Sequence, residues 1–132
     1  IRDDGESRGL GDVYKRQGVD SKSVVMNVGS AAVGYGFEYV ISTMDRVKAA
    51  ALQQGDANLQ MPIITPVASE AWGVKEAMAS ETDAPEWGSQ EERGIDMEVE
   101  TAMAVIAAGS NAVILKHPES IKIISGLMKE LV

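Results

Sequence analysis

The segment Gly34–Gln54 reads GYGFEYVISTMDRVKAAALQQ, and it decides how the rest of the chain can fold. Its apolar side chains recur at the three- and four-residue spacing of one helical face: Phe37, Val40, Ile41, Met44, Val47 and Ala51. This spacing predicts an amphipathic helix with one buried face. Gly34 and Gly36 flank Tyr35 at the helix entry, and glycine lets a backbone turn sharply or approach a ligand closely. The entry is therefore either a tight strand-to-helix turn or a loop that faces a ligand.

Composition sets broad limits on the class of protein. The chain has 132 residues, of which 45% are hydrophobic, as expected for one globular domain. A net charge of -8 argues against nucleic acid or an anionic membrane surface as the partner. The chain has no cysteine, so it supplies no thiolate to a disulfide, a zinc site or an iron–sulfur cluster. No apolar run approaches the ~18 residues of a membrane span, and no signal peptide is visible, so we expect a cytoplasmic protein.

The first 17 residues, IRDDGESRGLGDVYKRQ, differ from the rest in having no helical or strand periodicity. The string GLGDVYKRQ is typical of a translated sequencing adapter, and the alternative is a genuine disordered tail. We therefore expect two parts, a leader over 1–17 and one folded domain over 18–132.

The rest of the chain alternates between short apolar runs and amphipathic helical patterns. Strands are predicted at 23–28, 61–67 and 111–115, and helices at 34–54, 69–79, 89–108 and 118–131. Ser89 and Glu92 have the spacing of a capping box, and Pro118 suits a first helical turn. Such alternation predicts an α/β fold with a parallel sheet, either open or part of a β/α barrel. A barrel takes about 250 residues, so this chain could hold less than half of one.

Five blocks of residues, in this order, resemble one known family. The blocks are GYGFEY, EAWGVKEA, PEWGSQEERG, ETA and AGSNAVILKHPESI, and the likeness covers roughly Ser23–Val132. The family is the small (delta) subunit of the corrinoid iron–sulfur protein of the carbon monoxide dehydrogenase/acetyl-CoA synthase system. The resemblance implies the C-terminal part of a TIM (β/α)8 barrel, about three strand–helix units.

The same resemblance implies a role in methyl transfer. The corrinoid protein receives a methyl group from methyl-tetrahydropterin through a methyltransferase, and its cobalamin passes the group to acetyl-CoA synthase. The delta-like subunit shares the corrinoid with a larger subunit that carries the iron–sulfur cluster. The expected partners are therefore the large subunit in a heterodimer, with the methyltransferase and acetyl-CoA synthase as transient partners. No nucleic acid or membrane is expected as a partner.

Candidate site residues lie where strands end and helices begin, because ligands of β/α barrels bind at that rim. The resemblance and this position together give a cofactor-binding set: Asn27, Gly34, Tyr35, Gly36, Thr65, Glu70, Trp72 and His117. Several of these residues have a structural alternative. Glu70 and Trp72 could be a helix cap and a core residue, and Trp87 is either a stacking residue or a plug.

His117 is the only histidine, and a histidine before a proline is commonly a helix cap or a loop residue. We expect no metal ligand from it and no catalytic residue in the chain, which would make this a non-catalytic subunit. The alternative function is a pterin-binding methyltransferase of the TIM-barrel type. A third possibility is a scaffold with no ligand of its own.

Overall fold

The computed structural model describes residues 18–132, so the expected leader over 1–17 lies outside the described residues. The main helices are α2 (Phe37–Leu52), α5 (Gln90–Ala108) and α6 (Pro118–Leu131). The strands are β1 (Ile64–Pro66) and β2 (Ala112–Ile114). The short elements are the helices α3 (Val67–Ala71) and α4 (Lys75–Met78) and the 3-10 turns η1 (Ser21–Ser23), η2 (Ala57–Leu59) and η3 (Pro85–Trp87).

The strands pair in parallel, as the sequence predicted. β1 pairs with β2, with Thr65 opposite Val113, and a parallel bridge joins Met26 to Ile63 on the other side of β1. The expected first strand is limited to this bridge. The Met26 amide donates to the Pro62 carbonyl and the Ile64 amide donates to the Met26 carbonyl, but Pro62 has no N–H with which to extend the ladder.

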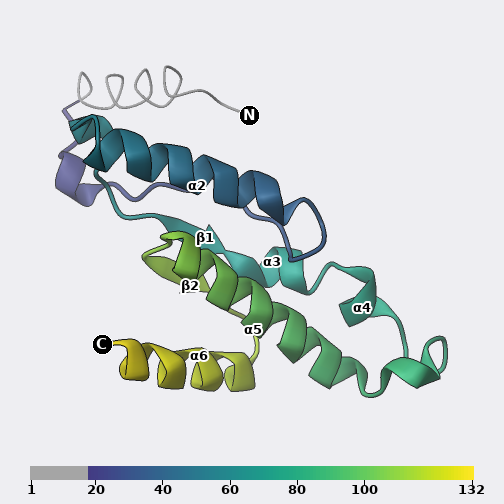
Figure 1. Cartoon of the computed structure of the whole chain (residues 1–132). Helices are drawn as coiled ribbons and strands as arrows, with labels where there is room; N and C mark the ends of the chain where they lie inside the picture. Colours follow the sequence, from purple (N-terminus) through teal and green to yellow (C-terminus); the bar gives the residue numbers. More distant parts are fainter. Residues whose placement is uncertain (1–17) are drawn as a thin grey trace.

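Three helices cover one face of the sheet. Figure 1 shows α2, α5 and α6 each running back against the direction of the strands. The core lies between these helices and the sheet, and its largest fully buried side chains include Met44 of α2, Ile63 and Val105 of α5. Successive strand–helix units with parallel strands are an α/β arrangement.

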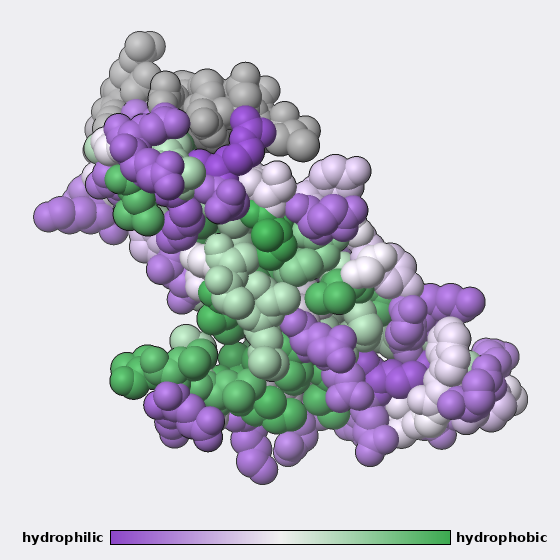
Figure 2. Space-filling view, viewed as in Figure 1, coloured by the Kyte–Doolittle hydropathy of each residue, from purple (hydrophilic) through white to green (hydrophobic). Residues whose placement is uncertain are grey.

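The opposite face of the sheet is open in the described part of the chain. Ile114 of β2 is 49% exposed and Val25, next to the Met26 bridge, is 57% exposed. Apolar side chains also gather on the outside of α6, where Figure 2 shows a hydrophobic area. The exposed apolar residues of that helix are Ile121, Ile123, Met128 and Leu131.

Two predicted helices differ in detail from the structure. The predicted helix at 69–79 is two short helices, α3 and α4, separated by a turn at Gly73. Glycine has a low helix propensity, and added bulk at Gly73 would crowd the main-chain oxygen of Ser69. The capping box at α5 is confirmed on one side, since Ser89 Oγ accepts from the Glu92 amide at 3.5 Å.

The 132-residue chain alone is expected to self-associate, because its open sheet face and α6 expose apolar surface. Light scattering across a concentration series should show a mass above 14.0 kDa that rises with concentration. A monomer at every concentration, with a sharp cooperative melt, would contradict this expectation.

Candidate functional site

Three loops meet at the carboxyl end of the sheet. They follow the Met26 segment, β1 and β2, and parallel strands place such loops at the same edge. Ala32 of the first loop is 1% exposed and packs in one cluster with Val74, Ala77 and Trp72, which follow β1. These contacts join the first loop to the segment that carries Trp72.

Trp72 is the centre of this edge. It ends α3, and its ring stacks on the His117 imidazole with a centroid distance of 5.8 Å and an interplanar angle of 18°. The Lys116 ammonium lies 5.1 Å from the centroid of the same indole. The Trp72 ring also packs against α5, where Gly94 leaves room for the ring because it has no Cβ. The structure therefore unites two predicted site residues, Trp72 and His117, and adds a cation.

His117 has hydrogen bonds at both ring nitrogens. It is the N-cap of α6, and its Nδ1 accepts from the Glu119 amide at 3.1 Å. A neutral ring that accepts at Nδ1 carries its proton at Nε2, which donates to Glu91 Oε1 at 2.8 Å. The prediction that His117 caps a helix is therefore confirmed. The same residue also lines the rim.

Glu98 lies beneath this rim and is fully buried, with 0% of its surface exposed. Its Oε2 accepts from the Lys116 amide at 2.8 Å, and its Oε1 accepts from the His117 amide at 3.0 Å. Both oxygens thus hold the short segment between β2 and α6.

The first loop supplies the other predicted residues. Gly34 and Gly36 have φ values of +86° and +84°, in the left-handed region that favours glycine. Asn27 is exposed, and its Oδ1 accepts from the Gly29 amide at 3.0 Å, which shapes the start of the loop.

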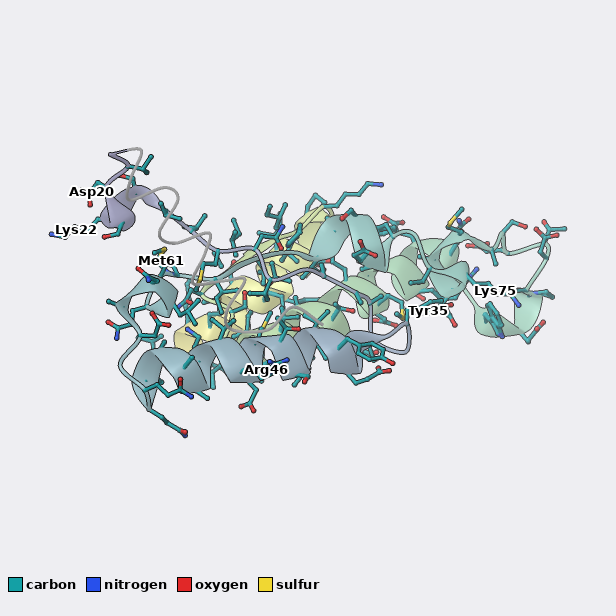
Figure 3. All side chains as sticks on the ribbon, turned by 90° about the horizontal axis from the view of Figure 1, so that it is seen from above. Asp20, Lys22, Tyr35, Arg46, Met61 and Lys75 are labelled. Carbon is teal, nitrogen blue, oxygen red and sulfur yellow. The ribbon has the colours of Figure 1, made fainter. Side chains whose placement is uncertain are left out.

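Tyr35 ties the first loop to α4. It is 48% exposed, and its hydroxyl donates to Glu76 Oε2 at 2.7 Å. This hydrogen bond raises the pKa of Tyr35 and lowers the pKa of Glu76. Figure 3 shows Tyr35 on the side of the molecule where Lys75 begins α4.

The remaining predicted residues, Thr65 and Glu70, occupy different environments. Thr65 is fully buried in β1, and its hydroxyl is 2.7 Å from the Oγ of Ser110, which precedes β2, so this hydroxyl bonds inside the protein toward the amino end of β2. Glu70 is exposed on α3, one turn from the rim.

An open pocket adjoins the Trp72–His117 stack. Its volume is about 690 Å³. Its lining includes both stacked rings and the side chains next to them: Trp72, Ala77, Met78, Gln90, Glu91, Lys116, His117 and Pro118. Mixed apolar and polar walls of this size suit an organic ligand with hydrogen-bonding groups at its edge.

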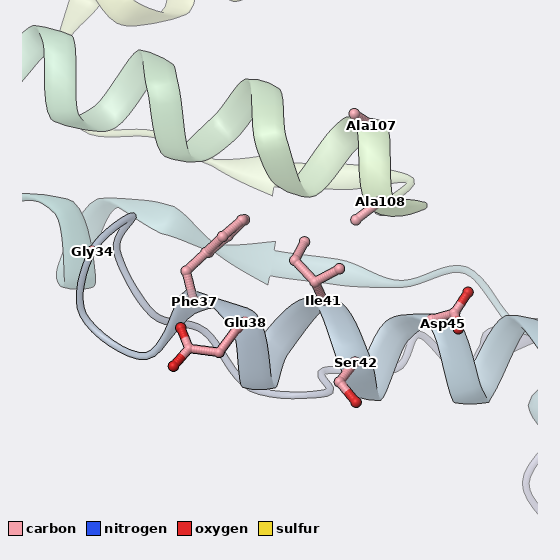
Figure 4. A pocket seen from close by; sticks show the side chains of 8 residues that line it. All are labelled: Gly34, Phe37, Glu38, Ile41, Ser42, Asp45, Ala107 and Ala108. Atoms are coloured by element: carbon pink, nitrogen blue, oxygen red, sulfur yellow. The ribbon is translucent and has the colours of Figure 1, made fainter.

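A second pocket of about 750 Å³ lies between α2 and α5 (Figure 4). Phe37 and Ile41 of α2 point toward Ala107 and Ala108 of α5, and Glu38 and Asp45 lie at its border. Gly34 is the only predicted site residue among those that line it.

Sequence reasoning missed Glu98 and Gly94. The apolar pattern of this helix predicts a buried stripe of Ile95, Val99, Ala102, Met103 and Ile106; Ala102 is indeed buried, but Met103 is 47% exposed. The buried face is shifted by one residue and consists of Gly94, Glu98, Thr101, Ala102 and Val105. These five residues also have the spacing of one helix face, and this spacing could have indicated the buried face. A glutamate among them, however, is typical of an exposed face.

Trp87 is neither buried nor part of the rim. It is 40% exposed, and its ring centroid lies 5.6 Å from Lys75 Nζ and 5.8 Å from Arg93 Cζ. Within residues 18–132 Trp87 is therefore a partly exposed side chain. Its contacts are those of a cation–π cluster at the surface.

Residues 18–132 contain neither a membrane-spanning helix nor a cluster of metal ligands. No helix there is long and apolar enough to cross a bilayer. No group of three or more histidine or acidic side chains in that range could hold a metal ion.

Comparison with known proteins gives one consistent family. The profile of the CO dehydrogenase/acetyl-CoA synthase delta subunit matches residues 2–129. The acetyl-CoA decarbonylase/synthase complex subunit delta of Archaeoglobus fulgidus is 32% identical over 123 residues, which are 90% of this chain and 26% of that protein. Subunit delta 1 of Methanosarcina thermophila is 30% identical over 125 residues, 90% of this chain and 28% of its own length. The delta subunit of Methanopyrus kandleri is 36% identical over 113 residues, 86% and 27% of the two chains.

Proposed function

The chain belongs to the CO dehydrogenase/acetyl-CoA synthase delta subunit family, and from this we propose that it holds a corrinoid at the rim around Trp72. The corrinoid would be shared with a larger, iron–sulfur-bearing subunit, in a complex that exchanges methyl groups with a methyltransferase and with acetyl-CoA synthase. The chain spans about a quarter of the length of the relatives it matches. We propose that the remaining length closes the sheet into a β/α barrel.

The open sheet face supports the barrel proposal. In a closed barrel the strands have one face toward the helices and one toward the interior, and both are buried. Here Ile63 and Thr65 are buried toward the helices, whereas Val25 and Ile114 are exposed. A barrel interior would cover these exposed side chains.

The rim residues fit a corrinoid. A corrinoid is a large, nearly flat ring system edged with amide groups, and it needs close approach by a backbone and polar contacts at its edge. No heavy atom lies within 4 Å of the position a Cβ would occupy at Gly34, so the loop leaves open space there. The Trp72–His117 stack adds a flat surface, and Lys116 adds a hydrogen-bond donor.

The proposed roles of this chain and of the larger subunit follow from the chemical groups that this chain contains and lacks. The corrinoid, when bound, would supply the cobalt that carries the methyl group. This chain would bind and orient the ring and limit water at the rim. His117 uses both ring nitrogens within the protein, which favours a binding role for it over cobalt ligation. The chain has no cysteine and so supplies no thiolate to an iron–sulfur cluster, which agrees with a cluster held by the larger subunit.

The observation that carries the proposal is the meeting of three family blocks at one edge of the sheet. GYG of the first loop, EAW after β1 and KHP after β2 lie far apart in the sequence, and the fold brings their loops together. Strand ends of this kind are where β/α barrels bind their ligands.

The test uses the completed chain, meaning this chain extended to the length of its relatives and paired with its large subunit. Gly34→Val should lower the cobalamin retained after gel filtration, because valine is strained at positive φ and fills the loop. Gly55→Val is the matched control, since Gly55 also has positive φ (+66°) and open space but lies beyond the other end of α2. Equal retention in both variants would contradict the proposed site.

Two further measurements separate the alternatives. His117→Ala should leave the electron paramagnetic signal of the cobalt unchanged, and a changed signal would make His117 a ligand. Tight binding of methyl-tetrahydropterin by the completed chain without its large subunit would favour the pterin-binding methyltransferase.

A further inference from the structure

A buried carboxylate lies under the rim and contacts main-chain groups there. Glu98 is in the middle of α5, and its two oxygens accept hydrogen bonds from the consecutive amides of Lys116 and His117. The bonded partners are 18 and 19 positions apart in the sequence, so both bonds are tertiary contacts. Neither amide belongs to the strand ladder, because β2 ends at Ile114.

The two hydrogen bonds explain why a carboxyl group is tolerated at full burial. Hydrogen bonds from N–H groups to an ionised carboxylate are among the stronger ones in proteins. The two amides also immediately precede α6, whose N-terminal end favours a nearby negative charge. An apolar side chain at position 98 would leave both partly buried amides without this acceptor.

Lys116 and His117, whose amides bond to Glu98, also contribute their side chains to the rim. Lys116 places its ammonium over the Trp72 ring, and the His117 imidazole stacks on that same ring. The N-cap bond of His117 and its bond to Glu91 both depend on where the His117 backbone lies. Displacing the Lys116–His117 backbone would therefore move the ammonium and the imidazole together.

We propose that Glu98 is the positioning residue of the rim, which fixes Lys116 and His117 against Trp72 through their main-chain amides. This inference rests on the proposed function for the claim that the rim holds a corrinoid. The positioning itself concerns residues of this chain alone and is tested without the cofactor.

The test compares Glu98→Gln with Glu100→Gln in the completed chain. Glutamine keeps the size of glutamate, but its NH2 group cannot accept, so one of the two amides loses its partner. Glu100 is exposed on the same helix, so its variant removes the same charge without touching the rim. The probe is the indole N–H resonance of Trp72 in ¹⁵N-labelled protein without corrinoid, assigned by its loss in Trp72→Phe.

We expect Glu98→Gln and His117→Ala to shift or broaden the Trp72 resonance, and Glu100→Gln to leave it in place. The Trp87 resonance should stay unchanged in all three variants, because Trp87 contacts Lys75 and Arg93 instead. General loss of stability would affect both tryptophans. A Trp72 resonance that moves in His117→Ala but not in Glu98→Gln would overturn the inference.

Hydrogen exchange in the unaltered chain gives a second test that needs no variant. The Lys116 and His117 amides should exchange slowly although they lie in a loop, and exchange as fast as in an exposed loop would overturn the inference. With the large subunit and cobalamin, Glu98→Gln should weaken corrinoid retention by about tenfold, because one amide of the Lys116–His117 segment loses its acceptor. If Trp72 shifts while retention is unchanged, the positioning role stands and the corrinoid site is elsewhere.

Discussion

Gly94→Ala is expected to destabilise the completed chain by about 1–3 kcal/mol, although alanine favours a helix over glycine by about 1 kcal/mol. A Cβ at Gly94 would overlap the Cζ3 and Cη2 atoms of Trp72, which are part of a rigid ring. The ring would have to leave its place, and with it the stack on His117 would be lost. Urea unfolding measures the change in free energy.

Gly126→Ala is the matched control for this prediction. Gly126 lies within α6, and no heavy atom is within 4 Å of the position of its Cβ. There the same substitution should stabilise the protein by about 0.5–1 kcal/mol. Opposite signs for the two variants would confirm that Trp72 occupies the space above Gly94, and equal signs would contradict it.

Met44→Ala is expected to cost about 2–5 kcal/mol, because it removes a buried side chain and leaves a cavity. Met44 lies on α2, has 0% exposed surface and packs in the core with residues of the sheet and of α5. Met103→Ala is the control, since Met103 is 47% exposed and should cost less than about 1 kcal/mol. A small effect at Met44 would mean that α2 is not packed on the sheet as described.

Much of the fold was predictable from the sequence. The apolar spacing over 34–54 predicted α2, which runs from Phe37 to Leu52, and the capping residue Ser89 marked the start of α5. These signals are local, because side chains three and four residues apart share a helix face and caps bond within one turn. The alternation of strands and helices likewise predicted the parallel pairing.

The candidate site was predictable only in part. Its general place, at the strand ends near Trp72 and His117, followed from the order of elements and from the family resemblance. The stacking of those two rings did not, because 45 positions separate residues 72 and 117 in the sequence. The burial of Thr65 within β1 could not be predicted either, because the side of the strand that is buried depends on which face the helices cover.

The sequence by itself determined the three long helices α2, α5 and α6 and the places of β1 and β2, because apolar spacing, caps and strand runs are properties of neighbouring residues. Only the tertiary structure decided the role of Glu98. A glutamate on a helix is normally solvated, and nothing local marks position 98 as an exception. Its burial requires two amides from a segment 18 and 19 residues away, brought there when β2 and α6 pack against α5.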